Sequence, residues 1–342
     1  MDKVKVGVVG ATGYAGEELI RILLNHPQVE INYLSAKIDK PTDIIEIFPQ
    51  FKKKISLICE ELDIEKLAKK SEVVFLATPH GYAHTIVPEL RKRDKIVIDL
   101  SADFRLKDEK LYKKWYNFEH SNKKFLEDAV YGLPEVYREE IKKNKLIANP
   151  GCYPTGVILG SLPLVKNSFL KENTIIVDTK SGATGAGRTL KTDLLFNEVN
   201  ETIRVYKINA HQHIPEIEQE LSLIGNKDIK TIFVPHLLPL SRGILSCIYI
   251  KLNKKFSTKD LLEFYNSFYK NEPFVRVLKE GNLPQLKSVQ FSNYCDIGIS
   301  VDQESDLAIV ISAIDNLGKG ASGQAVQNLN IIMGWEETVG LK

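Results

Sequence analysis

Cys152 stands in a segment whose residue types favour a nucleophilic sulfur. The segment, NPGCYPT at residues 149–155, joins a predicted strand that ends at Ile147 to a predicted helix that begins at Tyr153. Unpaired N–H groups at a helix N-terminus stabilise a thiolate and could bind an oxyanion on an attacked carbonyl. A small buried hydrophobe is the commoner role of cysteine. We expect that role for the other three cysteines, which are Cys59, Cys247 and Cys295. The turn residues on both sides predict that Cys152 is a nucleophile.

A thiolate nucleophile needs a proton partner, and the sequence contains a single HxH pair. His211 and His213 precede a predicted helix at Pro215–Ile224. Their spacing does not rank the two as general acid or base. Metal coordination is the alternative, but no third ligand accompanies the pair, so we predict no metal site. The remaining histidines are expected to be structural: His26, His80, His84, His120 and His236.

Two further segments suit an anionic substrate. Residues 181–188, SGATGAGR, place three glycines beside Arg188 after a predicted strand, and a flexible connector is the alternative. Arg105 belongs to LSADFR, which follows a predicted strand at Ile96–Leu100. The carboxyl edge of a parallel sheet is where ligands bind, and an arginine there could hold a phosphate in bidentate fashion. A solvated surface charge is the alternative for Arg105.

The segment GVVGATGYAG at residues 7–16 has the context of a dinucleotide fingerprint, because it follows a predicted strand and opens a predicted helix. Gly10 and Gly13 would let the backbone approach a pyrophosphate at the helix N-terminus. Gly16 would let the helix pack closely on the sheet. A strand-to-helix turn without a ligand is the alternative. Its place at the first strand of an alternating series favours a cofactor site.

The residues after the second predicted strand favour NADP(H) over NAD(H). Ser35 and Lys37 stand where an NAD enzyme usually has an acidic residue, and both suit a 2′-phosphate. Asp39 lies close enough to weaken this distinction, and a solvated Lys37 is the alternative. Near the C-terminus, Asn316 could hold a nicotinamide carboxamide through its amide.

Composition limits the class of protein. The chain has 342 residues, which favours two domains, and a hydrophobic fraction of 43% is typical of a globular protein. A net charge of +2 gives no reason to expect a nucleic-acid or membrane partner. We find no signal-peptide pattern and no apolar run of membrane-spanning length. Four widely spaced cysteines fit a reducing cytoplasm.

The hydrophobic pattern changes character along the chain. The first part alternates strands with helices, at Val4–Val9, Tyr14–Asn25, Ile31–Ala36, Ile64–Lys70, Val73–Ala77, Ala83–Arg93 and Ile96–Leu100. This alternation predicts an α/β fold with a doubly wound parallel sheet. Later strands are expected at Thr174–Lys180, Thr202–Lys207, Thr231–Val234 and Ile244–Leu252, with a hairpin at Cys295–Val301 and Leu307–Ala313. Later helices are expected at Tyr153–Lys166, Pro215–Ile224, Thr258–Tyr269 and Ala321–Gly334. The later part therefore predicts an α+β domain on a mostly antiparallel sheet.

Together these segments resemble the N-acetyl-gamma-glutamyl-phosphate reductase family of the semialdehyde dehydrogenase superfamily. The similarity covers nearly the whole chain, through GATGYAGEEL, LSADFRL, NPGCYPT, SGATGAGR, HQHIPEIEQE, VPHLLPLSRGI and DNLGKGASGQAVQN. It implies a Rossmann-type NADP-binding domain at residues 1–150 plus 316–342. It also implies a catalytic and oligomerisation domain at residues 151–315, and a homodimer or homotetramer.

The resemblance also implies roles for matching residues. Cys152 would be the nucleophile, His211 the general acid/base, and His213 a substrate or phosphate contact. The residues expected to bind substrate are Arg105, Ser181, Gly182, Arg188, His213 and Glu216. The residues expected to bind NADP(H) are Gly10, Thr12, Gly13, Tyr14, Ala15, Gly16, Ser35, Lys37, Pro79, Ser181, Gly182, Asn316 and Gly318.

The implied reaction is the NADPH-dependent reduction of N-acetyl-L-glutamyl 5-phosphate to the semialdehyde, through a thioester on Cys152, in arginine biosynthesis. Two alternatives remain at this stage. One is the same chemistry on another acyl phosphate, such as N-acetyl-aminoadipyl phosphate or aspartyl phosphate. The other is an NADP-binding sensor without catalysis, against which the presence of both Cys152 and His211 argues.

Overall fold

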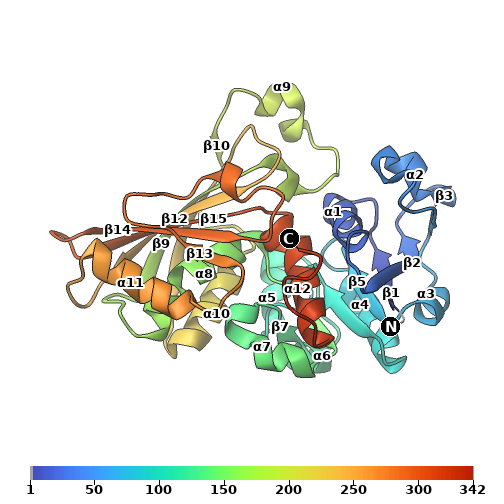
Figure 1. Cartoon of the computed structure of the whole chain (residues 1–342), viewed down its shortest axis with the longest axis horizontal. Helices are drawn as coiled ribbons and strands as arrows, with labels where there is room; N and C mark the ends of the chain where they lie inside the picture. Colours follow the sequence, from blue (N-terminus) through green and yellow to red (C-terminus); the bar gives the residue numbers. More distant parts are fainter. Residues whose placement is uncertain (1–2, 342) are drawn as a thin grey trace. The chain divides into compact units, whose positions relative to one another are not determined.

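The computed structural model describes residues 3–341. These residues divide into two compact units. The first unit runs up to Pro150 and resumes at Ala321, and the second unit is Gly151–Gly320. Each unit contains one large sheet, and Figure 1 follows the chain through both by colour.

The first unit is built on a sheet with strand order β3-β4-β2-β1-β5-β6-β8-β7. All of its pairs are parallel except the edge pair β3·β4. Its strands are β1 (Val4–Val9), β2 (Val29–Ser35), β3 (Thr42–Asp43), β4 (Ile58–Glu60), β5 (Val73–Leu76), β6 (Ile96–Asp99), β7 (Val130–Tyr131) and β8 (Leu146–Ala148). The central strands are continuous apolar runs because helices cover both faces of such a sheet, and all four residues of β5 are buried.

Helices fill the connections between these strands. They are α1 (Tyr14–Leu23), α2 (Ile44–Ile47), α3 (Ile64–Lys70), α4 (Ala83–Lys92), α5 (Lys110–Tyr116), α6 (Lys123–Asp128), α7 (Pro134–Lys143) and α12 (Gly323–Ile332), with a 3-10 turn at Pro49–Phe51. The last helix returns to the first unit, where α12 contacts both α1 and α7. Its residues Ala325, Val326 and Leu329 join the hydrophobic core of the sheet. The predicted doubly wound parallel sheet is confirmed.

The second unit is built on a mixed sheet with strand order β10-β11-β9-β12-β15-β14-β13. Its strands are β9 (Thr174–Ser181), β10 (Arg204–Val205), β11 (Lys230–Leu237), β12 (Ile244–Lys251), β13 (Val275–Val277), β14 (Cys295–Asp302) and β15 (Leu307–Ile314). The pairs β11·β9 and β13·β14 are parallel and the others are antiparallel. This confirms a mostly antiparallel α+β unit, including the predicted hairpin of β14 with β15.

The helices of the second unit lie against one face of its sheet (Figure 1). They are α8 (Cys152–Lys166), α10 (Ile214–Gly225) and α11 (Thr258–Tyr269). The short helix α9 (Phe196–Val199) lies away from the sheet, in the connection between β9 and β10, and 3-10 turns occur at Ala183–Ala186, Thr192–Leu194 and Leu286–Ser288. Gly160 of α8 packs so closely on the sheet that an added Cβ would lie 2.6 Å from Ile248 Cδ1. Ser257 and Asp260 form a capping box at the start of α11.

Several elements differ from the sequence prediction. The strand expected at Thr202–Lys207 is only the two-residue β10, because its flanking residues lie in an exposed connection. The helix expected at Ala321–Gly334 begins with a π-helical turn, Gly318–Ser322, before α12. Helices α5–α7 were not predicted. Helices α5 and α6 are short, and α7 (PEVYREEIKK) has too few apolar residues to give a helical period.

Candidate active site

Two close backbone contacts shape the glycine turn after β1. Gly10 has φ +86°, a left-handed conformation that favours glycine, and an added Cβ would lie 2.2 Å from the Ala77 carbonyl oxygen. At Gly16 an added Cβ would lie 2.3 Å from the Gly10 carbonyl oxygen, so α1 crosses directly over the turn. The N–H groups of Gly10 and Ala11 both donate to the Ser35 carbonyl, at 2.8 and 3.0 Å. The conformation of the turn is therefore set by contacts with the protein's own backbone.

The N-terminus of α1 has the features of an anion site. Its N-cap residue is Gly13, and no side chain caps the helix. An added Cβ at Gly13 would meet nothing closer than the Gly10 carbonyl oxygen, at 3.6 Å. The half-exposed residues around it are the expected cofactor contacts Thr12, Tyr14 and Ala15. Uncapped N–H groups together with the positive end of the helix dipole suit a pyrophosphate, so the residues present fit a dinucleotide.

We predict that Gly13→Ala weakens NADPH binding at least about tenfold, a difference of about 1.4 kcal/mol, while the protein stays folded. The methyl group finds room in the protein, so only a phosphate approaching the turn would meet it. Fluorescence titration with NADPH and urea unfolding give the two readouts. We expect unfolding to change by no more than about 1 kcal/mol, the cost of alanine at an N-cap. In the matched variant Gly10→Ala, stability should fall. NADPH binding by Gly13→Ala at wild-type strength would remove this turn from the cofactor site.

The other expected cofactor contacts of the first unit differ in exposure. Ser35 is fully buried and its hydroxyl has no hydrogen-bond partner, while its carbonyl holds the glycine turn. Lys37 is exposed just beyond β2, and Pro79 is exposed beyond β5. Lys37 is thus better placed than Ser35 to meet a 2′-phosphate.

Arg105 is buried rather than displayed on the surface. Its Nε donates to the Asn149 carbonyl and one Nη donates to the Leu100 carbonyl, both at 2.7 Å. The guanidinium therefore links the loop after β6 to Asn149, which directly precedes Pro150 and the turn that carries Cys152.

Asn149 is fixed by a polar network that the sequence did not reveal. Its N–H donates to the Asp99 carbonyl at 2.8 Å, and its Nδ2 donates to the Ala321 carbonyl at 3.0 Å. Asn328, buried in α12, donates from Nδ2 to Asn149 Oδ1 at 3.1 Å. These hydrogen bonds, all made by residues of the first unit, fix Asn149 at the start of the NPGC segment. Their only sequence signal is a run of amides in a helix that is otherwise apolar.

In the second unit, Cys152 is the first residue of α8, and it takes part in no disulfide. The N-cap, Gly151, has no side-chain cap, and its own N–H donates to Glu216 Oε1 at 2.7 Å. The first intrahelical bond runs from Thr155 N–H to the Gly151 carbonyl. The Cys152 and Tyr153 N–H groups therefore lie before that bond, where a helix offers donors to an anion. Glu216, which is fully buried, orients the turn that carries the sulfur.

The DNLGKG segment packs directly on Cys152. An added Cβ at Gly320 would lie 3.0 Å from Cys152 Cβ and 3.1 Å from the Asp315 carbonyl oxygen. Gly318, an expected cofactor contact, is held equally tightly, since its Cβ would lie 2.1 Å from the Ser292 carbonyl oxygen. The side chain at position 320 must be absent for the cysteine turn to keep its place.

The histidine pair belongs to an aromatic cluster with Tyr153, the residue that follows Cys152. The His211 and His213 rings have centroids 4.8 Å apart. Tyr153 meets both rings edge-on, at 5.2 and 5.8 Å. Phe233 completes the cluster at 5.5 Å from His211. The structure therefore brings the predicted acid/base pair to the N-terminus of α8.

His211 is held neutral with a defined tautomer. Its Nδ1 accepts a hydrogen bond from the His213 N–H at 3.1 Å, so the ring proton is on Nε2. Burial first, and the nearby Lys207 second, lower the pKa of His211 to about 3. At neutral pH this imidazole is an N–H donor.

The depressed pKa of His211 predicts a pH dependence of stability. The unfolded pKa is about 6.5 and the folded pKa lies below it, so the unfolded chain takes up the proton first as pH falls. This contribution is intact above pH 6.5 and is lost progressively below it, by about 2 kcal/mol at pH 5. In His211→Asn, whose Oδ1 can still accept the His213 N–H, the loss of unfolding free energy from pH 8 to pH 5 should shrink by that amount. Urea unfolding at both pH values tests this, with His236→Asn as control. An unchanged pH dependence in His211→Asn would contradict the assignment.

Two tyrosines missed by the sequence analysis join this site. The Tyr153 and Tyr206 hydroxyls lie 2.8 Å apart. Burial raises the pKa of Tyr206 to about 12, and the Cys152 charge adds to the rise. The pKa of Tyr153 is also raised, chiefly by burial, and its hydrogen bond with Ser181 opposes the rise. Ser181 and Tyr206 therefore both belong to the surroundings of Cys152. The only sequence signal for Tyr206 was its place five residues before His211.

The glycine loop after β9 is built by backbone pairing with the 240–243 turn. Gly182 N–H donates to the Gly243 carbonyl at 2.9 Å, and an added Cβ at Gly182 would lie 2.8 Å from Arg242 N. Asn316 joins the loop, since its Oδ1 accepts from Gly243 N–H at 2.8 Å and its Nδ2 donates to Thr184 Oγ1 at 3.0 Å. The amide of Asn316 thus organises the loop. Arg188 is exposed at the far end of the loop.

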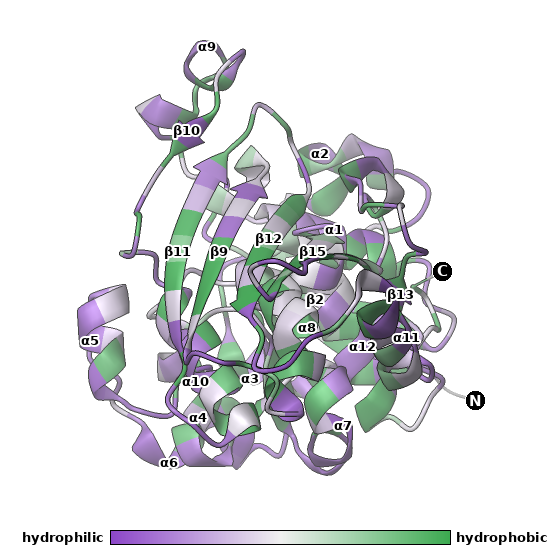
Figure 2. Cartoon of the chain, turned by 90° about the vertical axis from the view of Figure 1, so that its left-hand side faces the viewer, coloured by the Kyte–Doolittle hydropathy of each residue, from purple (hydrophilic) through white to green (hydrophobic). Residues whose placement is uncertain are grey.

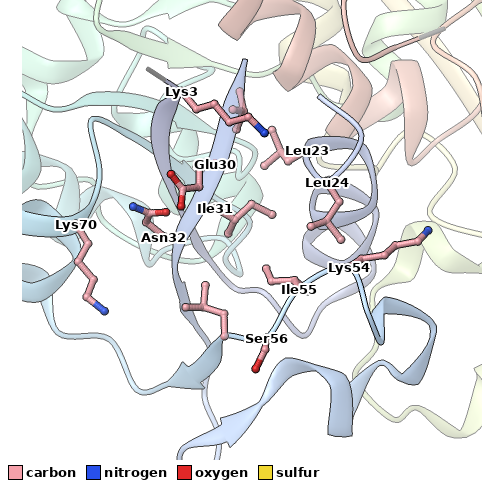
Figure 3. Close-up of a pocket in the computed structure, with 12 residues that line it drawn as sticks. Lys3, Leu23, Leu24, Glu30, Ile31, Asn32, Lys54, Ile55, Ser56 and Lys70 are labelled. Carbon is pink, nitrogen blue, oxygen red and sulfur yellow. The ribbon is translucent and has the colours of Figure 1, made fainter. Parts of the chain in front are cut away.

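A cavity in the first unit lies beside β2 and the end of α1 (Figure 3). It has a volume of about 550 Å³ and is lined by Lys3, Glu30, Lys54 and Lys70 among others. None of the expected site residues lines it.

Within residues 3–341, no three His, Cys, Asp or Glu side chains group as metal ligands. Over the same residues, no helix combines the length and apolarity needed to cross a membrane.

The comparisons with known proteins agree with the geometry. The family model for the semialdehyde dehydrogenase NAD binding domain matches residues 5–144, and the one for the dimerisation domain matches residues 152–316. An N-acetyl-gamma-glutamyl-phosphate reductase of Desulfotalea psychrophila is 51% identical over 99% of this chain and 98% of its own length. One of Pelotomaculum thermopropionicum is 49% identical over 99% of this chain and 97% of its own length.

The chain belongs to the N-acetyl-gamma-glutamyl-phosphate reductase family.

The fold extends beyond this reductase family. Aspartate semialdehyde dehydrogenase II of Vibrio cholerae superposes with a TM-score of 0.74 at 15% identity, over 98% of this chain and 99% of its own. An aspartate semialdehyde dehydrogenase of Candida albicans, whose structure contains NADP, superposes with a TM-score of 0.70 at 19% identity. The match covers 97% of this chain and 99% of the Candida chain. At such identities only the fold is shared. The predicted N-acetyl-gamma-glutamyl-phosphate reductase family membership and two-part α/β fold are confirmed.

Proposed function

We propose that this chain reduces N-acetyl-L-glutamyl 5-phosphate to N-acetyl-L-glutamate 5-semialdehyde and phosphate, with NADPH, in arginine biosynthesis. The observation that carries the proposal is the position of Cys152 as the first residue of α8. Glu216 accepts a hydrogen bond from the N–H of Gly151, the N-cap residue, and the His211 ring contacts Tyr153. The names of relatives near 50% identity over nearly the whole chain support the substrate.

The first step is acyl transfer to sulfur. The Cys152 thiolate attacks the acyl carbonyl carbon, a C–S bond forms, the C–O bond to phosphate breaks, and inorganic phosphate leaves. The N–H groups at the start of α8 stabilise the oxyanion of the tetrahedral intermediate. A thioester on Cys152 remains, and it accepts hydride more readily than a carboxylate does.

The second step releases the aldehyde. NADPH, when bound, supplies the hydride that the thioester carbonyl carbon receives, and the glycine turn at Gly10–Gly16 with Lys37 would hold it. The C–S bond then breaks, the thiolate of Cys152 is regenerated and the semialdehyde leaves. His211, as an Nε2–H donor, stabilises the oxyanion before collapse, and Tyr153 and Tyr206 hold its ring in place.

Substrate contacts are assigned to residues around the sulfur. His213, Ser181 and Gly182 lie in the same unit as Cys152, and Arg188 extends from the same glycine loop. Arg105 acts mainly by holding Asn149. We propose that the enzyme works in the cytoplasm as a homodimer or homotetramer, which fits the match to a dimerisation domain.

Steady-state NADPH oxidation tests the substrate. The kcat/KM for N-acetyl-L-glutamyl 5-phosphate should exceed that for N-acetyl-aminoadipyl phosphate, which is one methylene longer, by at least about tenfold. It should exceed that for aspartyl phosphate, which is shorter and lacks the N-acetyl group, by at least about 100-fold. A higher kcat/KM for either competitor would overturn the substrate assignment. NADPH binding without turnover of any acyl phosphate would instead indicate a sensor.

A further inference from the structure

The ends of four strands meet at one edge of the sheet in the second unit. Ile244, the first residue of β12, pairs with Ser181 at the end of β9 and with Ile314 at the end of β15. Ile314 also pairs with Cys295, the first residue of β14. Figure 2 shows β9, β12 and β15 side by side. The register therefore brings together the segments that adjoin these strand ends: the glycine loop, the 240–243 turn, residues 290–294 and the 315–320 turn.

A buried ion pair joins two of these segments. Arg242 Nε donates to both oxygens of the Asp315 carboxylate, at 2.9 and 3.1 Å. Asp315 is fully buried, and Arg242 is only 8% exposed. The guanidinium also lies over the Phe291 ring, 4.4 Å from its centroid. Each charge therefore depends on the other, because a buried charge that loses its partner is costly.

The Asp315 carboxylate also holds two stretches of backbone. Its Oδ1 accepts from the N–H groups of Leu317 and Gly318, at 2.8 and 3.2 Å, and its Oδ2 accepts from the Phe291 N–H. Phe291 has φ +61°, a left-handed conformation that is unfavourable for an aromatic residue. Such a conformation persists only where the surrounding structure holds it. The carboxylate thus fixes the turn that follows it and a strained residue of a neighbouring segment.

The turn held by Asp315 reaches Cys152 through Gly320. The Gly320 N–H donates to the Asp315 carbonyl at 2.9 Å, and an added Cβ at position 320 would lie 3.0 Å from Cys152 Cβ. The first turn of α8 also packs on the end of β15, since an added Cβ at Gly156 would lie 3.2 Å from Ser312 Oγ. A displacement of Asp315 would therefore be passed to the backbone that carries the sulfur.

Arg242 reaches the glycine loop in the same way. Gly182 packs on the backbone of Arg242, because an added Cβ at position 182 would lie 2.8 Å from Arg242 N. The Gly182 N–H donates to the Gly243 carbonyl at 2.9 Å. Ser181 and Gly182 are expected substrate contacts. The ion pair with Asp315 therefore sets where this loop lies relative to the turn that packs on the nucleophile.

We propose that the Arg242–Asp315 ion pair positions Cys152 against the glycine loop, so that the sulfur and the bound substrate are held in register. Both residues act through Gly320 and Gly182 rather than on the reacting atoms. A misplacement of about 1 Å can cost about 100-fold in rate, so the pair matters for turnover as well as for stability. The effect on turnover rests on the proposed function, whereas the effect on the thiol of Cys152 does not.

Arg242→Lys and Arg242→Met test the pair, with Arg276→Met as the matched control. Arg276 forms a similar ion pair in the same unit. Its guanidinium donates to both oxygens of Asp296, at 2.6 and 3.0 Å, and lies 4.1 Å from the centroid of the Tyr294 ring. Lysine keeps a cation beside Asp315 but cannot reproduce the planar fork of arginine, and methionine removes the charge. Urea unfolding measures the stability of each variant.

Both methionine variants should be less stable than wild type, but only Arg242→Met should lose turnover. We expect its kcat to fall at least about tenfold. In Arg242→Lys, kcat should fall at least about threefold although stability stays near that of wild type. A kcat within about twofold of wild type in Arg242→Lys, or the same loss of kcat in Arg276→Met as in Arg242→Met, would reduce the pair to a structural role and overturn the proposal.

Alkylation of Cys152 by iodoacetamide tests the same contact without a substrate. Mass spectrometry of the Cys152 peptide gives the rate between about pH 6 and 9, and its midpoint is the pKa of the thiol. We expect this pKa to rise by at least about 0.5 in Arg242→Lys, because the sulfur is no longer held against the N–H donors at the start of α8. The variant keeps its positive charge, so the rise reports geometry. Arg276→Met should match wild type.

A Cys152 alkylation profile in Arg242→Lys that coincides with that of wild type would contradict the positioning role. The two proposals fail in different ways. If wild type turned over no acyl phosphate while the alkylation profile still moved in Arg242→Lys, the proposed function would be wrong and the positioning of the thiol would stand.

Discussion

Replacing Cys152 by alanine is expected to lower kcat by at least about 1000-fold while leaving NADPH affinity unchanged. Loss of a covalent nucleophile removes the thioester route altogether, and binding and the oxyanion donors alone recover little of the rate. NADPH oxidation and NADPH fluorescence titration measure the two effects. Because Cys152 contributes its side chain at the first turn of α8 and not in a core, the fold should survive the change.

Cys247→Ala is the matched control for Cys152→Ala. Cys247 is half-exposed like Cys152 but lies on β12, where burial raises the pKa of its thiol. It should keep wild-type activity. Activity of Cys152→Ala within about tenfold of wild type would refute the nucleophile assignment.

Replacing His211 by alanine is expected to lower kcat by about 100- to 1000-fold, the range for loss of one hydrogen-bond donor to an oxyanion. His213→Ala should lose less kcat and more substrate affinity, because we assign it to substrate contact. Comparing the two variants thus decides which of His211 and His213 takes part in the chemical step, a question that the HxH spacing left open. His236→Ala, a change at a half-exposed position of β11, should remain active.

The wild-type pH profile gives an independent check on His211. Since its folded pKa is about 3, kcat/KM should show no ionisation of this imidazole between about pH 5 and 8. A break near pH 6.5 that disappears in His211→Asn would contradict the neutral donor role. A larger kcat loss in His213→Ala than in His211→Ala would reverse the two assignments.

Much of the fold follows from local patterns in the sequence. Ile64–Lys70 and Thr258–Tyr269 were predicted with their observed bounds, because N-cap residues and a helical apolar period agree there. The strands of both sheets were predicted where β-branched runs are continuous or alternate. The short edge strands β3, β7 and β13 were not predicted, since two or three residues carry no periodicity and depend on tertiary pairing.

The candidate site was predicted only in part. The helix start at Cys152 and the HxH pair are visible as motifs. The burial of Arg105 and the engaged amide of Asn316 are not, because residue type does not report which backbone groups a side chain will meet. Tyr206 lies in none of the quoted motifs, and Asn328 ends the DNLGKGASGQAVQN segment without a role assigned to it. Each is placed by packing between segments far apart in the sequence.

The central claim is that an acyl group is carried on Cys152, and a single-turnover burst in the reverse direction tests it most directly. The enzyme is mixed with N-acetyl-L-glutamate 5-semialdehyde and NADP⁺ without phosphate, and the product is digested for mass spectrometry. We predict a rapid burst of NADPH equal to the concentration of sites, with one N-acetylglutamyl group on the Cys152 peptide that phosphate addition releases. A burst with the acyl group on another residue, or turnover with phosphate but no acyl group on Cys152, would contradict the account.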